Sequence, residues 1–302
     1  MYIYIYIYTC ILRMTSHTHH SASFLLCRRR LLLYQFSDWT EEEVDKTLRG
    51  VGYDPNRTFD HMPVYALEEG ANATKAPDSW DWRQQGKMTR VKSQGQCGSC
   101  WAFAATATVE AAWAIKGGHP LTDFSPQHLV DCSRGNHGCN GGYYDRAYHY
   151  VNKHGGMAKE SSYPYKEADN QCPGRGPPPE GGTVSKWGLA SPPCHSGPCV
   201  DHECPQCIAQ VIAQHGPVAV YVDSKALPSY TGGLMTHHDC SSQNSDRDHV
   251  VVIVGYNTAA RPRYWIVRNS WGENWGENGH FRVKIGKNVC GIGNEPGYIM
   301  AI

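Results

Sequence analysis

From residue 76 onward, the hydrophobic residues follow mainly helix-like patterns in the first half and form mainly short strand-like runs in the second. Residues 99–116 are rich in Ala, contain no Pro or Gly and are apolar on most faces, which predicts a buried helix. Further helices are predicted at 125–131, 144–153 and 208–215. Short apolar runs predict strands later in the chain, at 218–223, 249–256, 264–269 and 280–285.

Helices that come first and strands that come later are typical of an α+β fold. We therefore expect two lobes, one mainly helical and one built on a sheet. The Pro- and Gly-rich residues 173–182 are expected to form a loop.

The first 33 residues do not have the composition of a segment that folds. Tyr and Ile alternate from Tyr2 to Tyr8, and His17-Thr18-His19 is a second short repeat; dinucleotide repeats in DNA give such patterns on translation. No basic stretch precedes an apolar run, as a signal peptide requires. Our hypothesis is that residues 1–33 are translated non-coding sequence and that the true signal peptide is missing.

Composition limits the classes of function. Lys plus Arg and Asp plus Glu both number 28, so the net charge is zero and gives no indication of nucleic-acid binding. No apolar run reaches the roughly 20 residues of a membrane span. Thirteen cysteines indicate an oxidising compartment and hence a secreted or vesicular protein. Because this count is odd, one cysteine stays unpaired if all the others form disulfides.

The run Gln-Gly-Gln-Cys-Gly-Ser-Cys-Trp-Ala-Phe, from Gln94 to Phe103, places Cys100 at the start of the predicted buried helix. Ser99 stands where a helix-capping residue is expected. A thiol in the first turn faces the positive end of the helix dipole, which favours the thiolate. Together with a histidine base, such a cysteine is a nucleophile.

Further motifs follow along the chain, namely Asp131-Cys132, Gly138-Cys-Asn-Gly-Gly142, Asp248-His249 and Asn269-Ser-Trp-Gly272. In this order they resemble the motifs of the papain-like cysteine peptidases, and the sequence around them is similar to cathepsin L. A lone Cys-Gly-Ser-Cys would also suit a redox or metal site, but the complete set favours the peptidase. The resemblance extends from about residue 76 to the C-terminus.

The resemblance implies a papain-like two-lobed fold, with a helical lobe, a β-barrel-like lobe and the active-site cleft between them. It implies an endopeptidase that acts on peptide and protein substrates through a thioester acyl-enzyme, without a cofactor. Cys100 would be the nucleophile, His249 the acid and base, and Asn269 the residue that holds the imidazole. Gln94 would donate to the oxyanion together with the Cys100 backbone N–H, and Trp271 would shield the bond between His249 and Asn269 from water.

Substrate binding is implied for a second group of residues. Gly141 and Gly142 would let the substrate backbone approach closely and pair as a short strand. The side chain two residues before the cut would enter a pocket formed by Tyr143, Tyr144, Arg247, Val250 and Glu295. Glu295 stands where cathepsin B has an acidic residue that accepts arginine. We expect Arg247 to form an ion pair with Glu295, which would weaken any preference for Arg and favour Phe or Leu; the alternative is that Arg247 points to solvent.

Residues 34–75 resemble the end of a papain-type propeptide, with a capping-box pattern from Thr40 to Glu43. The long helices that precede it in such propeptides are missing, so autoinhibition by this chain is not predicted. Cleavage near residue 75 would leave a mature peptidase domain of 76–302. The resemblance implies cystatin-like inhibitors and the propeptide itself as further partners. It also implies three disulfides, which are Cys97–Cys139, Cys132–Cys172 and Cys240–Cys290.

Residues 194–207 form an insert with four cysteines and two histidines. Their spacing suits a zinc loop, but in an oxidising compartment two disulfides among the four thiols are expected instead, and hence no metal. The four cysteines are Cys194, Cys199, Cys204 and Cys207. The loop supports an alternative function, a catalytically silent papain-fold binding protein with a Cys/His-rich metal loop. A transglutaminase-like acyltransferase is a third possibility, although it would not need the Gly138–Gly142 motif.

Overall fold

The structure is a computed structural model that describes residues 40, 42–44, 50, 54, 57–59, 61–66, 75–193 and 203–302. The hypothesis about residues 1–33 therefore falls outside the described residues. So do most of the predicted propeptide segment and residues 194–202 of the insert.

The helices after residue 75 are α4 (Cys100–Lys116), α5 (Pro126–Cys132), α6 (Tyr144–His154) and α7 (Pro205–His215). Each agrees with a predicted helix to within three residues at either end. Helix α4 has 14 of its 17 residues in the interior, because its side chains are small or apolar on nearly every side.

Residues at the helix ends show how α5 begins, how α6 ends and how α4 differs from the prediction. The Ser125 hydroxyl caps α5 by accepting a hydrogen bond from the His128 N–H at 3.1 Å. Gly155 ends α6 in the left-handed conformation, with φ of 85°. The prediction that Ser99 caps α4 is wrong, since its hydroxyl makes no cap bond and lies 2.7 Å from the Tyr165 hydroxyl instead.

The strands of the described residues form one sheet. They are β1 (Ser79–Asp81), β2 (Lys186–Leu189), β3 (Val218–Val222), β4 (Leu234–Met235), β5 (His249–Asn257), β6 (Tyr264–Arg268), β7 (His280–Lys284) and β8 (Gly297–Ala301). Their order is β2-β8-β3-β5-β6-β7-β4, with β1 paired to β5, and every pair is antiparallel except β4 with β7. Within the described residues the outer strands β2 and β4 do not pair, so the sheet is open and the expected barrel-like lobe is not a closed barrel.

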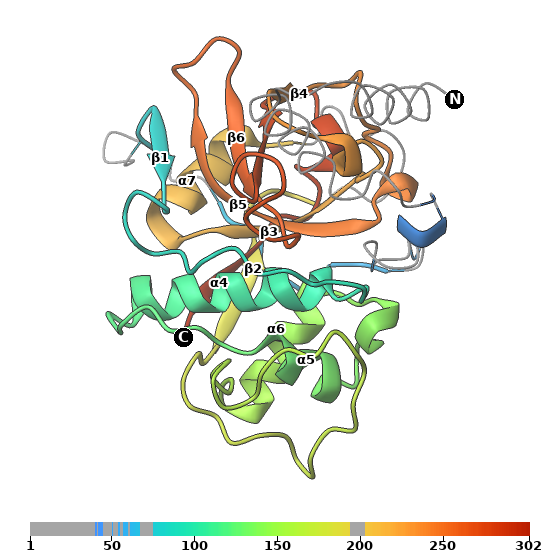
Figure 1. Ribbon diagram of the computed structural model, residues 1–302. Helices are drawn as coiled ribbons and strands as arrows, with labels where there is room; N and C mark the ends of the chain where they lie inside the picture. The colour runs from blue at the N-terminus through green and yellow to red at the C-terminus, as the bar shows by residue number, and fades with distance from the viewer. Residues whose placement is uncertain are drawn as a thin grey trace, which may run out of the picture.

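Strand β5 separates two hydrophobic cores, because successive side chains of a strand point to opposite faces. Val250, Val252 and Val254 pack into the core that contains α4, α5 and α6. Val251 and Ile253 pack into the core that contains α7. Figure 1 shows α4 lying across the middle of the molecule, with the sheet on one side and α5 and α6 on the other. The predicted two-lobed α+β arrangement is confirmed, and α4 lies between its two parts.

Disulfides join Cys97 to Cys139, Cys132 to Cys172 and Cys240 to Cys290, which confirms the expected pairing. At the end of the insert, Cys204 and Cys207 also form a disulfide. This bond agrees with the expectation of disulfides there, while Cys194 and Cys199 lie outside the described residues. None of the described helices has the length and apolar character needed to cross a membrane.

Candidate active site

Cys100 is the first residue of α4 and is fully buried. Among the described residues it is the free cysteine. Burial raises the pKa of its thiol to about 12, although backbone N–H groups of Val250, Gly50 and Trp101 donate to the sulphur and oppose the rise. In this conformation the burial of the sulphur therefore opposes the thiolate expected from the helix dipole.

Gly50, from the segment that precedes the expected mature domain, covers the sulphur. Its carbonyl accepts a hydrogen bond from the Gly142 N–H at 2.8 Å. A Cβ at position 50 would lie 2.1 Å from the Gly98 carbonyl oxygen and 3.2 Å from the Cys100 Sγ, so only glycine fits there. A backbone thus pairs with Gly142 in front of the thiol, in the place expected for substrate. Because the long propeptide helices are missing, autoinhibition was not predicted from the sequence. This contact was not anticipated.

His249 opens β5, and its neighbour Val250 lies against the Cys100 sulphur. Asn269 follows the last residue of β6, and the antiparallel pairing of β5 with β6 brings it beside His249. The His249 Nε2 lies 2.8 Å from the Asn269 Oδ1. Because an amide oxygen can only accept, Nε2 carries the proton of this bond. The Ser270 N–H donates to the same oxygen at 2.8 Å and fixes the amide.

Trp271 covers the pair formed by His249 and Asn269. Its ring centroid lies 5.0 Å from that of His249, and the residue is 1% exposed. Trp275 packs against Trp271 edge to face, with 5.2 Å between the ring centroids. The imidazole–amide hydrogen bond therefore lies in a medium that excludes water, which strengthens it.

Gln94 is fully buried beside the start of α4. Its Oε1 accepts from the Ser270 hydroxyl at 2.6 Å, and its Nε2 donates to the Cys97 carbonyl at 2.9 Å. The Tyr165 hydroxyl donates to the Gln94 backbone carbonyl at 2.8 Å. These bonds hold the amide in one orientation within a few residues of Cys100.

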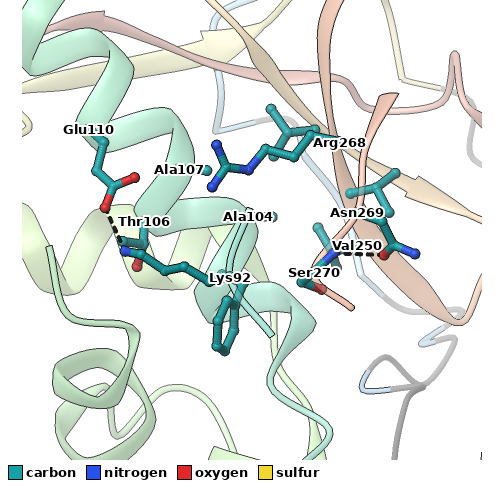
Figure 2. Close-up of a pocket in the computed structure, with 12 residues that line it drawn as sticks. Lys92, Ala104, Thr106, Ala107, Glu110, Val250, Arg268, Asn269 and Ser270 are labelled. Carbon is teal, nitrogen blue, oxygen red and sulfur yellow. Dashed lines mark hydrogen bonds and ion pairs between the residues drawn. The ribbon is translucent and has the colours of Figure 1, made fainter. Parts of the chain in front are cut away.

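Buried charges anchor the elements that carry these residues. Lys92 Nζ donates to Glu110 of α4 at 2.7 Å, and Figure 2 shows this bond together with Arg268 and Asn269. Arg268, the last residue of β6, donates to the carbonyls of residues 89 and 90 at 2.7 and 2.6 Å, and its desolvation lowers its pKa. A cavity of about 10 Å³, room for about one water molecule, lies among them. This network ties the end of β6 to α4 and so limits the movement of Asn269.

The residues expected to bind a substrate side chain lie together near Gly142. Arg247 and Glu295 form the predicted ion pair, with Nη1 2.5 Å from Oε2 and side chains 9% and 5% exposed. The Tyr144 hydroxyl donates to the Glu295 carbonyl at 2.6 Å. Val250 lies opposite Tyr221 in the pairing of β3 with β5, and the ring of Tyr221 is 6.4 Å from that of Tyr143.

The family model described as papain family cysteine protease matches residues 76–300. The chain belongs to the papain family of cysteine proteases. The family inferred from the motifs is thus confirmed, together with its fold and with the enzyme class of a cysteine-type peptidase that acts on peptides or proteins.

Individual members of the papain family are similar to this chain over most of their length. Mouse cathepsin K is 34% identical over 272 residues, which cover 89% of this chain and 77% of cathepsin K. Mouse procathepsin L is 36% identical over 272 residues, which cover 87% of this chain and 75% of the relative. The solved digestive procathepsin L2 proteinase from Tenebrio molitor larval midgut superposes with a TM-score of 0.75 at 33% identity, covering 90% of this chain and 86% of that one. These similarities do not favour the alternative of a silent binding protein.

Sequence reasoning missed three residues of this papain-family site. Tyr165 bonds both Ser99 and the Gln94 backbone, and Tyr221 adds a ring to the predicted pocket. Asp145, directly after Tyr144, forms an ion pair with Arg57. Only Asp145 had a signal in the sequence, since it stands beside two predicted pocket residues.

No group of three or more His, Cys, Asp or Glu side chains in the described part of the chain could hold a metal ion. The Cys204–Cys207 disulfide removes two thiols from the proposed zinc loop. The two histidines of the insert, His195 and His202, lie outside the described residues.

Proposed function

We propose that this papain-family chain is an endopeptidase in which Cys100, His249 and Asn269 act as a catalytic triad. The observation that carries the proposal is the 2.8 Å bond from His249 Nε2 to Asn269 Oδ1, beneath Trp271 and beside the start of α4. In this proposal the other ring nitrogen, Nδ1, exchanges a proton with the thiol.

In the proposed reaction, His249 takes the proton of Cys100 and the thiolate attacks the carbonyl carbon of the substrate. The imidazolium then gives its proton to the leaving amine, and a thioester with Cys100 remains. Water, activated by the neutral imidazole, hydrolyses the thioester and restores the thiol. Asn269 keeps the ring oriented through both proton transfers.

The negative charge that develops on the carbonyl oxygen requires hydrogen-bond donors. We assign this role to Gln94 Nε2 and to the Cys100 backbone N–H. The bonds that Gln94 makes to Ser270 and to the Cys97 carbonyl support the assignment, because they fix its amide before substrate arrives. Such preorganised donors do not have to be reoriented during the reaction.

We further propose that residues 34–75 are removed to give the mature domain of 76–302. Gly50 now covers the sulphur, and its removal would admit water and substrate, so that the pKa of Cys100 falls from its raised value. Before its removal, the segment would act as an internal inhibitor. After removal, in the lysosome or outside the cell, cystatin-like proteins would compete with substrate for the same cleft.

The substrate backbone would pair with Gly142, as Gly50 does in the uncleaved chain. The side chain two residues before the cut would lie in the pocket of Tyr143, Tyr144 and Val250, next to the ion pair of Arg247 with Glu295. Gly50 is an internal residue of a longer chain, so a substrate backbone that continues on both sides of this position could pair in the same way, which supports the proposal of an endopeptidase.

The test is hydrolysis of a doubly blocked fluorogenic peptide by the chain after limited proteolysis has removed the segment. The Cys100→Ala variant should lose hydrolysis and unfold at nearly the same temperature as the unaltered chain, since little volume is removed. At mildly acidic pH, iodoacetamide should label Cys100 slowly in the uncleaved chain and rapidly once the segment has been removed. Hydrolysis that survives in Cys100→Ala would disprove the assignment.

A further inference from the structure

Arg57 belongs to the segment before the expected mature domain, yet its side chain is only 11% exposed because it packs against that domain. Its Nη2 forms an ion pair with Asp145 Oδ1, and its Nη1 donates to the Tyr221 hydroxyl at 3.0 Å. Its guanidinium carbon lies 3.6 Å from the centre of the Tyr143 ring. Arg57 therefore meets a carboxylate, a hydroxyl and an aromatic face together, which are the groups that recognise a guanidinium.

The contacts of Arg57 lie next to the place where a substrate backbone is expected to bind. Tyr143 directly follows Gly142, the residue whose N–H pairs with the Gly50 carbonyl in front of Cys100. The ring of Tyr221 lies 5.1 Å from that of Tyr144, which is a further member of the expected side-chain pocket. A side chain from a backbone bound at Gly142 would therefore reach the same three groups.

The other carboxylate of the pocket is already engaged. Glu295 is held by Arg247 at 2.5 Å, so it offers no charge to an incoming side chain. Asp145 lies in the first turn of α6, where the helix dipole favours a negative charge. Its present partners, Arg57 and the more distant His61 at 4.0 Å, both belong to the segment that would be removed.

Removal of that segment changes the balance of charge. Arg57 and Asp145 line a groove of about 980 Å³, into which the carboxylate would open. Arg146 stays in place, with its guanidinium 4.7 Å from the centre of the Tyr143 ring. The Asp145 carboxylate would then be open to a new cation, and a substrate guanidinium would restore both the charge pair and the fork-shaped hydrogen bonds.

We propose that Asp145, Tyr221 and Tyr143 form a guanidinium-binding subsite for an arginine side chain of the substrate, and that Arg57 occupies this subsite in the uncleaved chain. The inference rests on the proposed function and names its substrate class, peptides with arginine at this position. The expectation of Phe or Leu considered Glu295 as the acidic group of the pocket and its neutralisation by Arg247, whereas the subsite uses a second carboxylate, Asp145.

The first test compares two blocked peptides that differ only at the second residue before the cut, arginine in one and citrulline in the other. Citrulline keeps the shape of arginine and has no charge. With the enzyme obtained by limited proteolysis of the full chain, kcat/KM should be about 10- to 100-fold higher for arginine, as for a charged hydrogen bond.

The Asp145→Asn variant should lose most of that ratio, because the amide keeps the shape of the carboxylate and removes its charge. Asp78→Asn, at an exposed aspartate just before β1, is the matched control and should keep the ratio. Equal rates on the two peptides, or a ratio that Asp145→Asn leaves unchanged, would overturn the subsite.

A second test needs no catalysis and uses the full chain with Cys100→Ala. Ethylguanidinium should raise the unfolding temperature of the Arg57→Ala variant by about 2–4 °C more than ethylurea does, because it fills the vacated subsite. The double variant Arg57→Ala/Asp145→Asn should show no such difference, and the same difference in both variants would refute the role of Asp145. If no peptide is cleaved in the first test, the proposed peptidase function fails while this measurement still decides the subsite.

Discussion

His128 should make the folded chain less stable at acidic pH. The residue is fully buried in the helical lobe. Its Nδ1 accepts a hydrogen bond from the Ala158 N–H at 3.1 Å, and its Nε2 lies 2.9 Å from the Tyr150 hydroxyl. Protonation of Nδ1 would remove the acceptor of the first bond. Burial, with a smaller contribution from His154, lowers the pKa of His128 from 6.5 to about 3.

The sign of the effect follows from proton linkage. Between pH 3 and 6.5 the unfolded chain binds a proton at this position that the folded chain does not, so stability rises with pH in this window and is lost as pH falls. At pH 4.5, two units below the unfolded pKa, the loss is about 3 kcal/mol, at about 1.4 kcal/mol per unit.

Urea unfolding at pH 7.0 and 4.5 measures this loss, in chains that carry Cys100→Ala to prevent self-digestion. His128→Gln should cost stability at pH 7.0 because it alters a packed, hydrogen-bonded site. The free-energy gap between the two chains should then shrink by about 3 kcal/mol at pH 4.5. His215 and His280, whose pKa values burial lowers to about 4, act in both chains and cancel.

Replacement of the exposed His149 by Gln is the control and should leave the pH dependence unchanged. If the unaltered chain and His128→Gln differ by the same free energy at both pH values, the linkage argument for His128 is refuted.

Three further predictions follow from buried polar contacts. Gln94→Ala should lower kcat by about 100-fold with little change in KM, through loss of an oxyanion donor; an unchanged kcat would contradict that role. Arg247→Met should reduce the free energy of unfolding by about 3–5 kcal/mol, because Glu295 loses its buried partner, and the double variant Arg247→Met/Glu295→Leu should recover most of it in the same urea titration. Lys92→Met should cost a similar amount, about 3–5 kcal/mol, since Lys92 neutralises Glu110 at 2.7 Å; a loss below about 1 kcal/mol would show that the network is not stabilising.

The elements that the sequence predicted well are those with an uninterrupted pattern. The Ala-rich run of α4 extends over several helical turns, and the valine run of β5 over several residue pairs. Both elements begin and end within one residue of the predicted bounds. Strands β1, β2 and β4 were not predicted, because two to four residues carry too little periodicity to show. Strand β8 was not predicted either, although it is as long as β3, β6 and β7, which were.

The parts of the site that sequence reasoning missed depend on distant contacts. Ser99 has the residue type and place of a helix cap, but Tyr165, 66 positions away, takes its hydroxyl. The thiolate predicted at Cys100 did not take account of the burial of the sulphur, against which Gly50 lies, and this burial raises the pKa of the thiol. The ion pair of Arg247 with Glu295 could be anticipated, since the family resemblance placed both residues in one pocket.

Helix α4 has a consequence for engineering this chain. Its small side chains are buried on nearly every side, so it has almost no face on which a larger residue could be accepted. In a mutational library, substitutions such as Ala107→Leu or Ala111→Leu should therefore spread the two halves of the molecule apart instead of being absorbed locally. Because Cys100 begins this same helix and His249 belongs to the sheet beside it, such variants would lose catalytic alignment before they lose the fold. Attempts to raise thermal tolerance are better directed at α5, α6 and the surface loops.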